Sequence, residues 1–251
     1  IRRRLSASVP APVARAVDMM SPAVADHHRR VAYLAFRLAQ EMPLPEQEAC
    51  DLAIAGALHD VGAFSLHERL DALAFEDTQP GPHSLAGYLL LKEFPPFASL
   101  ASYIRFHHIP WEHGAGQTQA GNPVPLGSHV LHLADRVVVQ IAKGEALLGQ
   151  VPRICENIEH RKGLIFEPEL VDAMLRLAKR DYIWMEMHSD AVISLLRKET
   201  ASRSQELGLD DLLEFARLLC RIIDFKSEFT ATHSTGVAVT AVALARLTGF
   251  S

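Results

Sequence analysis

The sequence predicts an all-α fold, because apolar residues recur at helical spacing along most of the chain. Val31, Leu34, Ala35 and Leu38 follow the i, i+3, i+4, i+7 pattern of one buried helix face. A similar apolar pattern follows Pro168, and proline favours the first turn of a helix. No segment shows the sustained apolar–polar alternation of a half-buried strand. We therefore expect a helical bundle.

The helices are expected in a definite order along the chain. After the first helix, small apolar residues from Leu52 to Leu58 lead into His59 and Asp60. The Pro80-Gly81-Pro82 breaker precedes another helix. Further helices are predicted over residues 98–107, 126–143, 168–178, 190–203 and 210–223. Residues 113–125 are rich in Gly, Gln and Pro, which predicts a surface loop.

Composition excludes several classes of protein. Hydrophobic residues make up 49% of the 251 residues and charged residues 22%, which is typical of a globular protein with a core. A net charge of −5 argues against a partner such as a nucleic-acid duplex. No apolar run reaches the roughly 18 residues of a membrane span, and no signal-peptide h-region follows the basic N-terminus. Cys50, Cys155 and Cys220 lie far apart, which predicts free thiols in a reducing cytoplasm.

Histidine is the compositional exception, with 13 residues. In His59-Asp60, the carboxylate could bridge two cations while the imidazole binds one of them. Gly62 would then let the backbone leave the helix close to the metals. A lone His-Asp pair is more often a capping or surface pair, so its weight depends on the other histidines.

The other candidate ligands also have simpler interpretations. His107-His108 near a helix end could be a surface pair, and His83 could be an ordinary polar residue at a helix start. Asp135 interrupts an apolar series, where a carboxylate is costly unless it is paired or bound to metal. Its alternative role is a salt bridge to Arg136 or Arg105.

In combination, these residues resemble the HD superfamily, and within it the HD-GYP subfamily. The resemblance covers about residues 25–178. Its motifs are His27-x-x-Arg30-Val31-Ala32, Leu58-His59-Asp60-Val61-Gly62, His83-Ser84-Leu85-Ala86-Gly87, His107-His108, Leu133-Ala134-Asp135 and Phe166-Glu167-Pro168-Glu169-Leu170-Val171. The resemblance implies an HD-type helical bundle with a C-terminal helical extension.

The resemblance also implies a two-metal site. One ion would be held by His27, His59, Asp60 and Asp135, and the second by Asp60, His83, His107 and His108. Iron or manganese suits such a donor set, while zinc or nickel is also compatible. The implied reaction is hydrolysis of a phosphoester by metal-activated water, in this subfamily a cyclic dinucleotide such as cyclic di-GMP. Asp60 and His59 would be the catalytic residues.

The sequence departs from the subfamily pattern around the predicted metal site. Ala63 replaces the usual Lys, the segment from His107 to Gln117 lacks the Tyr and Pro of the GYP loop, and Val137, Val138, Val139 and Gln140 replace a basic segment. Arg30, Arg105 and Arg136 are the remaining candidates for phosphate contact. Two hypotheses follow: an active phosphodiesterase with altered substrate choice, or a catalytically weak metal-binding module that regulates a downstream HD-GYP domain.

A short internal repeat suggests the domain organisation. His27 is followed four residues later by Val31-Ala32, and His233 by Val237-Ala238. We expect a lead-in segment (1–24), an HD domain (25–180), a helical connector (181–222) and the start of a second HD domain (223–251). Because the first residue is not Met, the chain is expected to be a piece of a longer protein. Its C-terminal helices could form a homodimer.

The remaining histidines and tryptophans have simpler predicted roles. Surface positions are predicted for His28, His67, His113, His160 and His188. His132, three residues before Asp135, could either support the metal site or pack in the core. Trp111 and Trp184 are predicted to pack, and Trp111 could alternatively line a wall on which a base stacks.

Overall fold

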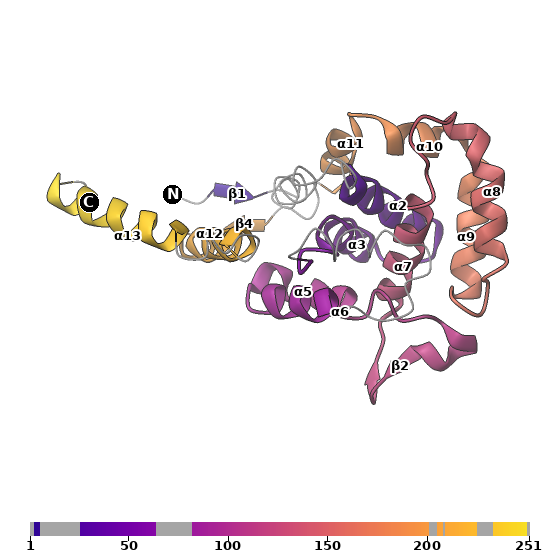
Figure 1. Cartoon of the computed structure of the whole chain (residues 1–251), viewed down its shortest axis with the longest axis horizontal. Coiled ribbons are helices and arrows are strands. Elements are labelled where there is room, and N and C mark those ends of the chain that lie inside the picture. Colours follow the sequence, from indigo (N-terminus) through magenta and orange to yellow (C-terminus); the bar gives the residue numbers. More distant parts are fainter. Residues whose placement is uncertain are drawn as a thin grey trace. The chain divides into compact units, whose positions relative to one another are not determined.

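The computed structural model describes residues 3–5, 26–63, 82–200, 205–207, 209–224 and 233–249. Helices make up most of these residues, which confirms the all-α prediction (Figure 1). Before residue 206 they are α2 (His27–Glu41), α3 (Glu46–Leu58), α5 (Pro82–Lys92), α6 (Pro95–Arg105), α7 (Leu126–Val138), α8 (Leu147–Glu159), α9 (Pro168–Ala178), α10 (Asp181–His188) and α11 (Val192–Glu199). After it come α12 (Leu209–Asp224) and α13 (His233–Leu247).

The helical bundle is centred on α2 and α3, which pack along one another. α2 also contacts α7, while α6 contacts α5, α3 and α7. Gly56 of α3 permits the α2–α3 crossing, because a Cβ atom there would lie 2.8 Å from the Ala32 Cα. This close crossing brings the start of α2 to the end of α3. Three of the predicted ligands, His27, His59 and Asp60, lie at those two helix ends.

Local sequence features account for several helix boundaries. The Glu167 side chain accepts a hydrogen bond from the Leu170 amide at the start of α9, and Pro168 occupies the first turn. α7 ends at Val138, five residues before the predicted end at residue 143. The buried Gln150 side chain of α8 accepts a hydrogen bond from the Ala142 amide at 2.8 Å and donates one to its carbonyl. These hydrogen bonds hold the segment around Ala142 in a non-helical conformation.

The predicted surface loop at 113–125 contains regular structure. The 3-10 helix η1 (Glu112–Gln117) leads into strands β2 (Thr118–Gln119) and β3 (Asn122–Pro123), which pair antiparallel. Ala120 and Gly121 between them both have positive φ, as a tight two-residue hairpin turn requires. A second two-stranded sheet joins β1 (Arg3–Leu5) to β4 (Gln205–Leu207). Strands of two or three residues are too short to show apolar–polar alternation in the sequence.

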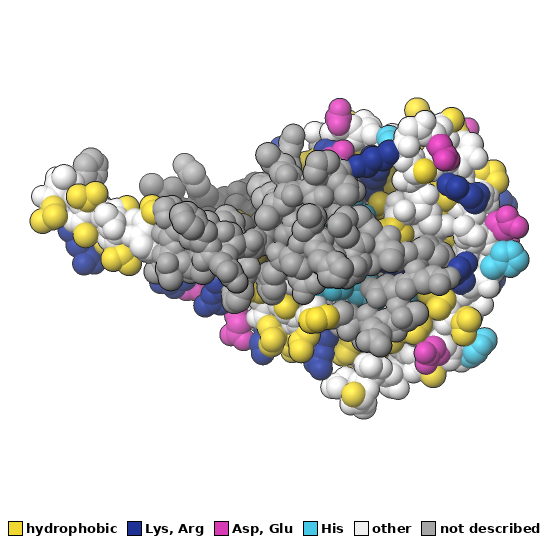
Figure 2. Space-filling model, in the orientation of Figure 1, with side chains coloured by type: hydrophobic (Ala, Val, Ile, Leu, Met, Phe, Trp, Pro, Cys, Tyr) yellow, Lys and Arg dark blue, Asp and Glu magenta, His cyan; other side chains and the backbone are white. Residues whose placement is uncertain are grey.

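The chain divides into two units near residue 206. The first unit contains the helices from α2 to α11, and the second contains α12 and α13, which contact each other. Apolar side chains of α13 are exposed, among them Val239 and Leu247 (Figure 2). The predicted boundaries at 24, 180 and 222 stay predictions. In the part of the chain that the structure describes, no helix has the length and apolar character needed to cross a membrane.

Candidate metal centre

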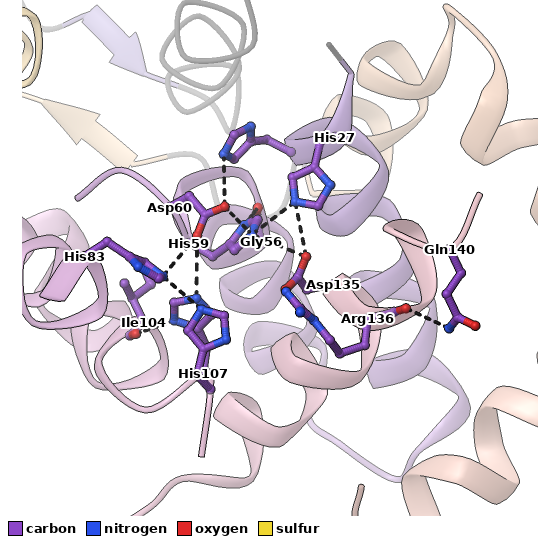
Figure 3. A network of polar contacts seen from close by, with 12 residues as sticks. His27, Gly56, His59, Asp60, His83, Ile104, His107, Asp135, Arg136 and Gln140 are labelled. Carbon is purple, nitrogen blue, oxygen red and sulfur yellow. Dashed lines mark hydrogen bonds and ion pairs between the residues drawn. The ribbon is translucent and has the colours of Figure 1, made fainter. Parts of the chain in front are cut away.

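Seven residues predicted to bind metal converge in the interior of the first unit (Figure 3). They come from the start of α2, the end of α3, the first turn of α5, the end of α6 and the middle of α7. These residues are His27, His59, Asp60, His83, His107, His108 and Asp135, and each is at most 6% exposed. Residues separated by more than 100 positions therefore share one buried cluster.

The first group of donors contains His27, His59 and Asp135. The Nε2 atoms of the two histidines lie 3.4 Å apart, and the His27 Nε2 lies 3.2 Å from the Asp135 Oδ1. The distance from the His59 Nε2 to the same oxygen is 3.8 Å. Two imidazole nitrogens and one carboxylate oxygen therefore face a common point, as donors to one cation do.

The second group contains Asp60, His83, His107 and His108. The Asp60 Oδ1 lies 3.5 Å from the His83 Nε2 and 3.7 Å from the His107 Nε2. The Nε2 atoms of His83 and His108 are 2.9 Å apart. This group has one carboxylate oxygen and three imidazoles, which suit a divalent transition ion.

Asp60 lies between the two groups. Its Oδ2 is 3.1 Å from the His59 Nε2, whereas its Oδ1 faces His83 and His107. The two oxygens of one carboxylate are thus directed at different sets of imidazoles (Figure 3). This is the arrangement that a bridging ligand requires.

Backbone carbonyls orient two of the imidazoles. The Nδ1–H of His59 donates a hydrogen bond to the Gly56 carbonyl at 2.9 Å, and the Nδ1–H of His107 donates one to the Ile104 carbonyl at 2.6 Å. A carbonyl can only accept, so these bonds fix the proton on Nδ1. The Nε2 atom of each neutral ring is left with a lone pair, which can bind a cation, on the side that faces Asp60.

Several atoms of the cluster require a partner that protein groups do not supply. The Asp60 Oδ1, the His107 Nε2 and the Asp135 Oδ1 are buried and have no hydrogen-bond partner among the described residues. Burying a polar atom without a partner costs about 1–3 kcal/mol, and more when the group is charged. One cation in each donor group would satisfy these three atoms, so the donor set fits a metal centre.

Electrostatic interactions keep both carboxylates ionised. Burial would raise their pKa values, but His59 and His107 hold the pKa of Asp60 well below its usual range, and Arg136 does so for Asp135. Burial would lower the pKa of His59, but Asp60 and Asp135 outweigh it and raise that pKa to about 9. Without an ion, the cluster therefore holds a proton on His59 at neutral pH.

Arg136 is a partner of Asp135, in agreement with the alternative role considered for that aspartate. Its Nη2 and Nε atoms donate hydrogen bonds to the Asp135 Oδ2 at 2.5 and 3.1 Å. The guanidinium occupies Oδ2 and leaves Oδ1 directed at His27 and His59. Arg136 is 1% exposed. Its predicted contact with a substrate phosphate stays a prediction.

The other two candidate phosphate ligands are partly exposed. The Arg30 Nη2 lies 3.4 Å from the His188 Nε2. Arg105 stacks its guanidinium over the rings of Tyr88 and Phe106. A role for either arginine in substrate binding stays a prediction.

Gly62 has a different role from the expected one. A Cβ atom at this position would lie 2.2 Å from the His83 carbonyl oxygen and 2.4 Å from the Gly87 nitrogen. The residue is needed because the chain after α3 touches the backbone of α5, a contact that brings Asp60 close to His83. The neighbouring Ala63 is fully buried.

The surface prediction for His28 is wrong. Its side chain is 2% exposed, and its Nε2 lies 3.9 Å from the Asp60 Oδ2. A signal was present in the sequence, because His28, Ala32, Ala35 and Ala39 share one helix face of small residues that can pack closely. All four are buried.

The remaining histidines divide into buried and exposed residues. His132 is buried against the Phe166 ring, and burial lowers its pKa to about 3, so it is neutral. His129, which the sequence reasoning did not single out, is buried edge-on to Trp111. The surface prediction is confirmed for His113, His160 and His188, and His67 lies outside the described residues. The packing prediction for Trp184 is confirmed, since it is fully buried.

A comparison with protein families identifies the part of the chain that carries the cluster. Residues 24–139 match the family model of the HD domain. All seven of the clustered ligand residues lie within this range, from His27 to Asp135.

Two relatives of this chain are named as phosphodiesterases. The chain is 30% identical over 95% of its length to the 3′3′-cGAMP-specific phosphodiesterase 1 of Vibrio cholerae. It is 26% identical over 61% of its length to a cyclic di-GMP phosphodiesterase of Thermotoga maritima. The chain spans 57% and 44%, respectively, of the length of these relatives.

A solved structure supports the fold. The crystal structure of a cyclic GMP-AMP-specific phosphodiesterase of V. cholerae matches with a TM-score of 0.74, covering 100% of this chain and 67% of that one. The two sequences are 18% identical. The similarity therefore shows a shared fold.

Proposed function

We propose that this HD protein is a metal-dependent phosphodiesterase with a two-ion centre and a cyclic dinucleotide substrate. The observation that carries the proposal is the position of Asp60, whose two oxygens face two separate groups of buried imidazoles. The names of the two relatives support 3′3′-cGAMP and cyclic di-GMP as the first substrates to assay.

In this proposal, His27, His59, Asp60 and Asp135 hold the first ion, and Asp60, His83, His107 and His108 hold the second. Iron or manganese is favoured, with zinc or nickel compatible. Ions bound there would activate water as a nucleophile and neutralise charge on the phosphoryl group. The resemblance to the HD-GYP subfamily agrees with this ligand order, and membership of that subfamily is part of the proposal.

The residues of the chain supply orientation and a shielded environment. The Gly56 and Ile104 carbonyls direct the Nε2 atoms of His59 and His107 at Asp60. Burial of the whole donor set excludes bulk water, which strengthens electrostatic interactions with a developing negative charge. Arg30 and Arg105 are the candidates for binding the substrate's phosphates.

The second candidate function is a metal-binding regulatory module with little or no catalysis. It is favoured by Ala63, which is buried where the subfamily usually has Lys. It is also favoured by the segment that follows His108, which forms η1 and the β2–β3 hairpin and lacks the Tyr and Pro of the GYP loop. In this case the ions would serve structure or sensing.

Metal content and hydrolysis, measured together, test the proposal. The chain would be purified without chelators or a metal-affinity tag and compared with Asp60→Ala and with the exposed-histidine control His160→Ala. We expect two transition ions per chain and hydrolysis of a cyclic dinucleotide in the wild type and the control. Asp60→Ala should lose both ions and at least about 100-fold in activity.

The outcomes separate the two candidate functions. Two ions without hydrolysis of either dinucleotide would favour the regulatory module. One ion or none, unchanged by Asp60→Ala, would contradict the two-ion centre itself.

The setting of the protein is a further part of the proposal. We propose that it acts in the cytoplasm, where its three free thiols would remain reduced.

We also propose that it can form a homodimer through its C-terminal helices, supported by the exposed apolar side chains of α13. Sedimentation of the chain with and without residues 233–251 would test the dimer.

A further inference from the structure

His28 lies beside the metal centre although it is outside the set of seven residues. It occupies the second position of α2 and is 2% exposed. Its ring centroid lies 5.3 Å from that of His27 and 5.1 Å from that of His59. With His59 and Asp60 it forms a third group of donors, whose ligand atoms all lie within 4.8 Å of one another.

The contact with Asp60 shows which half of the centre His28 belongs to. The His28 Nε2 lies 3.9 Å from the Asp60 Oδ2, the oxygen that also faces the His59 Nε2 at 3.1 Å. The Oδ1 atom of Asp60 faces His83 and His107. His28 therefore lies on the side of the first ion.

This third group does not form an independent third ion site. The Nδ1 of His59 is committed to the Gly56 carbonyl, so this ring has a single donor atom, Nε2. The Nε2 atom also faces His27 and Asp135, and one lone pair can coordinate only one ion. An ion bound by His59 would therefore be shared by both groups.

We propose that His28 is a fifth protein ligand of the first ion, together with His27, His59, Asp60 and Asp135. This proposal rests on the two-ion centre proposed above. Adjacent ligands of an ion bound at about 2.1 Å lie about 3 Å apart in octahedral geometry, and opposite ligands about 4.2 Å apart. The 3.9 Å between the His28 Nε2 and the Asp60 Oδ2 falls between these two values.

The additional ligand makes the two ions unequal. With five protein ligands, a six-coordinate first ion retains one open position, whereas the second ion, with four protein ligands, retains two. A site with fewer protein ligands is the one that accepts water and substrate. The phosphate of the substrate is therefore assigned mainly to the side of His83, His107 and His108.

The first ion can be studied alone in a His83→Ala background, which removes a ligand of the second ion. Mn²⁺ binding would be measured by electron paramagnetic resonance, with and without His28→Ala, and the visible spectrum of bound Co²⁺ would report the ligand set. We expect His28→Ala to weaken Mn²⁺ binding about 10- to 100-fold and to alter the Co²⁺ spectrum. His160→Ala in the same background should change neither.

A second variant separates ligand loss from misfolding. His28→Gln retains a side chain with a donor oxygen and should restore part of the Mn²⁺ affinity, while circular dichroism of the ion-free variants checks their fold. Unchanged Mn²⁺ affinity and an unchanged Co²⁺ spectrum in His28→Ala would overturn the proposal. Because these readouts do not depend on hydrolysis, an inactive wild type would contradict the enzymatic function and leave the ligand test intact.

Discussion

The two halves of the metal centre differ in how completely protein groups surround them. In the first half, Arg136 binds the outer oxygen of Asp135, and His28 adds an imidazole beside Asp60. In the second half, His83, His107 and His108 share a single carboxylate oxygen, the Asp60 Oδ1. The charge of the first half is thus balanced partly by Arg136, whereas in the proposed centre a cation would compensate the donors of the second half.

This difference suggests separate roles for the two halves of the proposed centre. Arg136 and a proton on His59 can stabilise the first half in the absence of an ion. In the proposed two-ion centre, the second ion would have fewer protein ligands and would be the one that binds substrate. The contrast can be tested by changing each half separately.

The largest effect is expected for Arg136→Met. Removing one partner of a buried ion pair leaves the Asp135 carboxylate uncompensated and costs about 3–5 kcal/mol. We therefore expect the free energy of unfolding to fall by that amount in ion-free protein, as measured by urea denaturation with a chelator present. With ions bound the loss should be smaller, because the first ion also neutralises Asp135. A loss below about 1 kcal/mol without ions would contradict this role.

Binding of the first ion should depend on pH. The pKa of His59 is raised to about 9, so its Nε2 must release a proton before it binds an ion at neutral pH. Affinity for the first ion should rise about tenfold per pH unit, or about 100-fold from pH 6.5 to 8.5. Mn²⁺ titrations in the His83→Ala background would measure it, and a flat profile would contradict the expectation.

The same shift predicts the sign of a stability change. Because the folded-state pKa of His59 exceeds its ordinary value of 6.5, protonation stabilises the ion-free fold. That stabilisation is fully present below about pH 6.5 and is lost as the pH rises through about 9. Urea denaturation of ion-free protein at several pH values would detect the loss, and His59→Gln should abolish the dependence.

Two glycines offer a matched pair of smaller perturbations. Gly62→Ala would press against the backbone of α5 and should weaken mainly the second half, because Asp60 and His83 would move apart. Gly56→Ala would press against Ala32 of α2 and should weaken mainly the first half. Each should cost about 1–3 kcal/mol of stability. Equal loss of both ions in both variants would show that the halves do not respond independently.

The smallest effects are expected at the partly exposed arginines. Arg30→Ala and Arg105→Ala should each raise KM for a cyclic dinucleotide about two- to fivefold, because solvent screens their charges. Metal content should be unchanged. Arg161, which is partly exposed and donates a hydrogen bond to the Asn157 carbonyl of α8, offers a matched control variant, Arg161→Ala. Steady-state kinetics would test this, and an unchanged KM in both variants would remove Arg30 and Arg105 from the substrate site.

The sequence alone was sufficient for the fold class and for the order of the clustered ligands. Helical periodicity predicted the bundle, and each ligand lay in a recognisable motif at a helix start or end, or on an apolar helix face. Helix ends were less predictable, as the early end of α7 shows. There the reason is a contact from Gln150, which lies eight residues beyond Ala142 and belongs to the next helix.

Only the tertiary structure decided which additional residues lie beside the predicted ligands. Periodicity within a helix specifies which face of that helix is buried, but not what faces it from other helices. The burial of His28 and the contact of Gly62 with α5 depend on how closely two helices approach. The choice between Arg136 and Arg105 as the partner of Asp135 likewise depended on how several helices pack together.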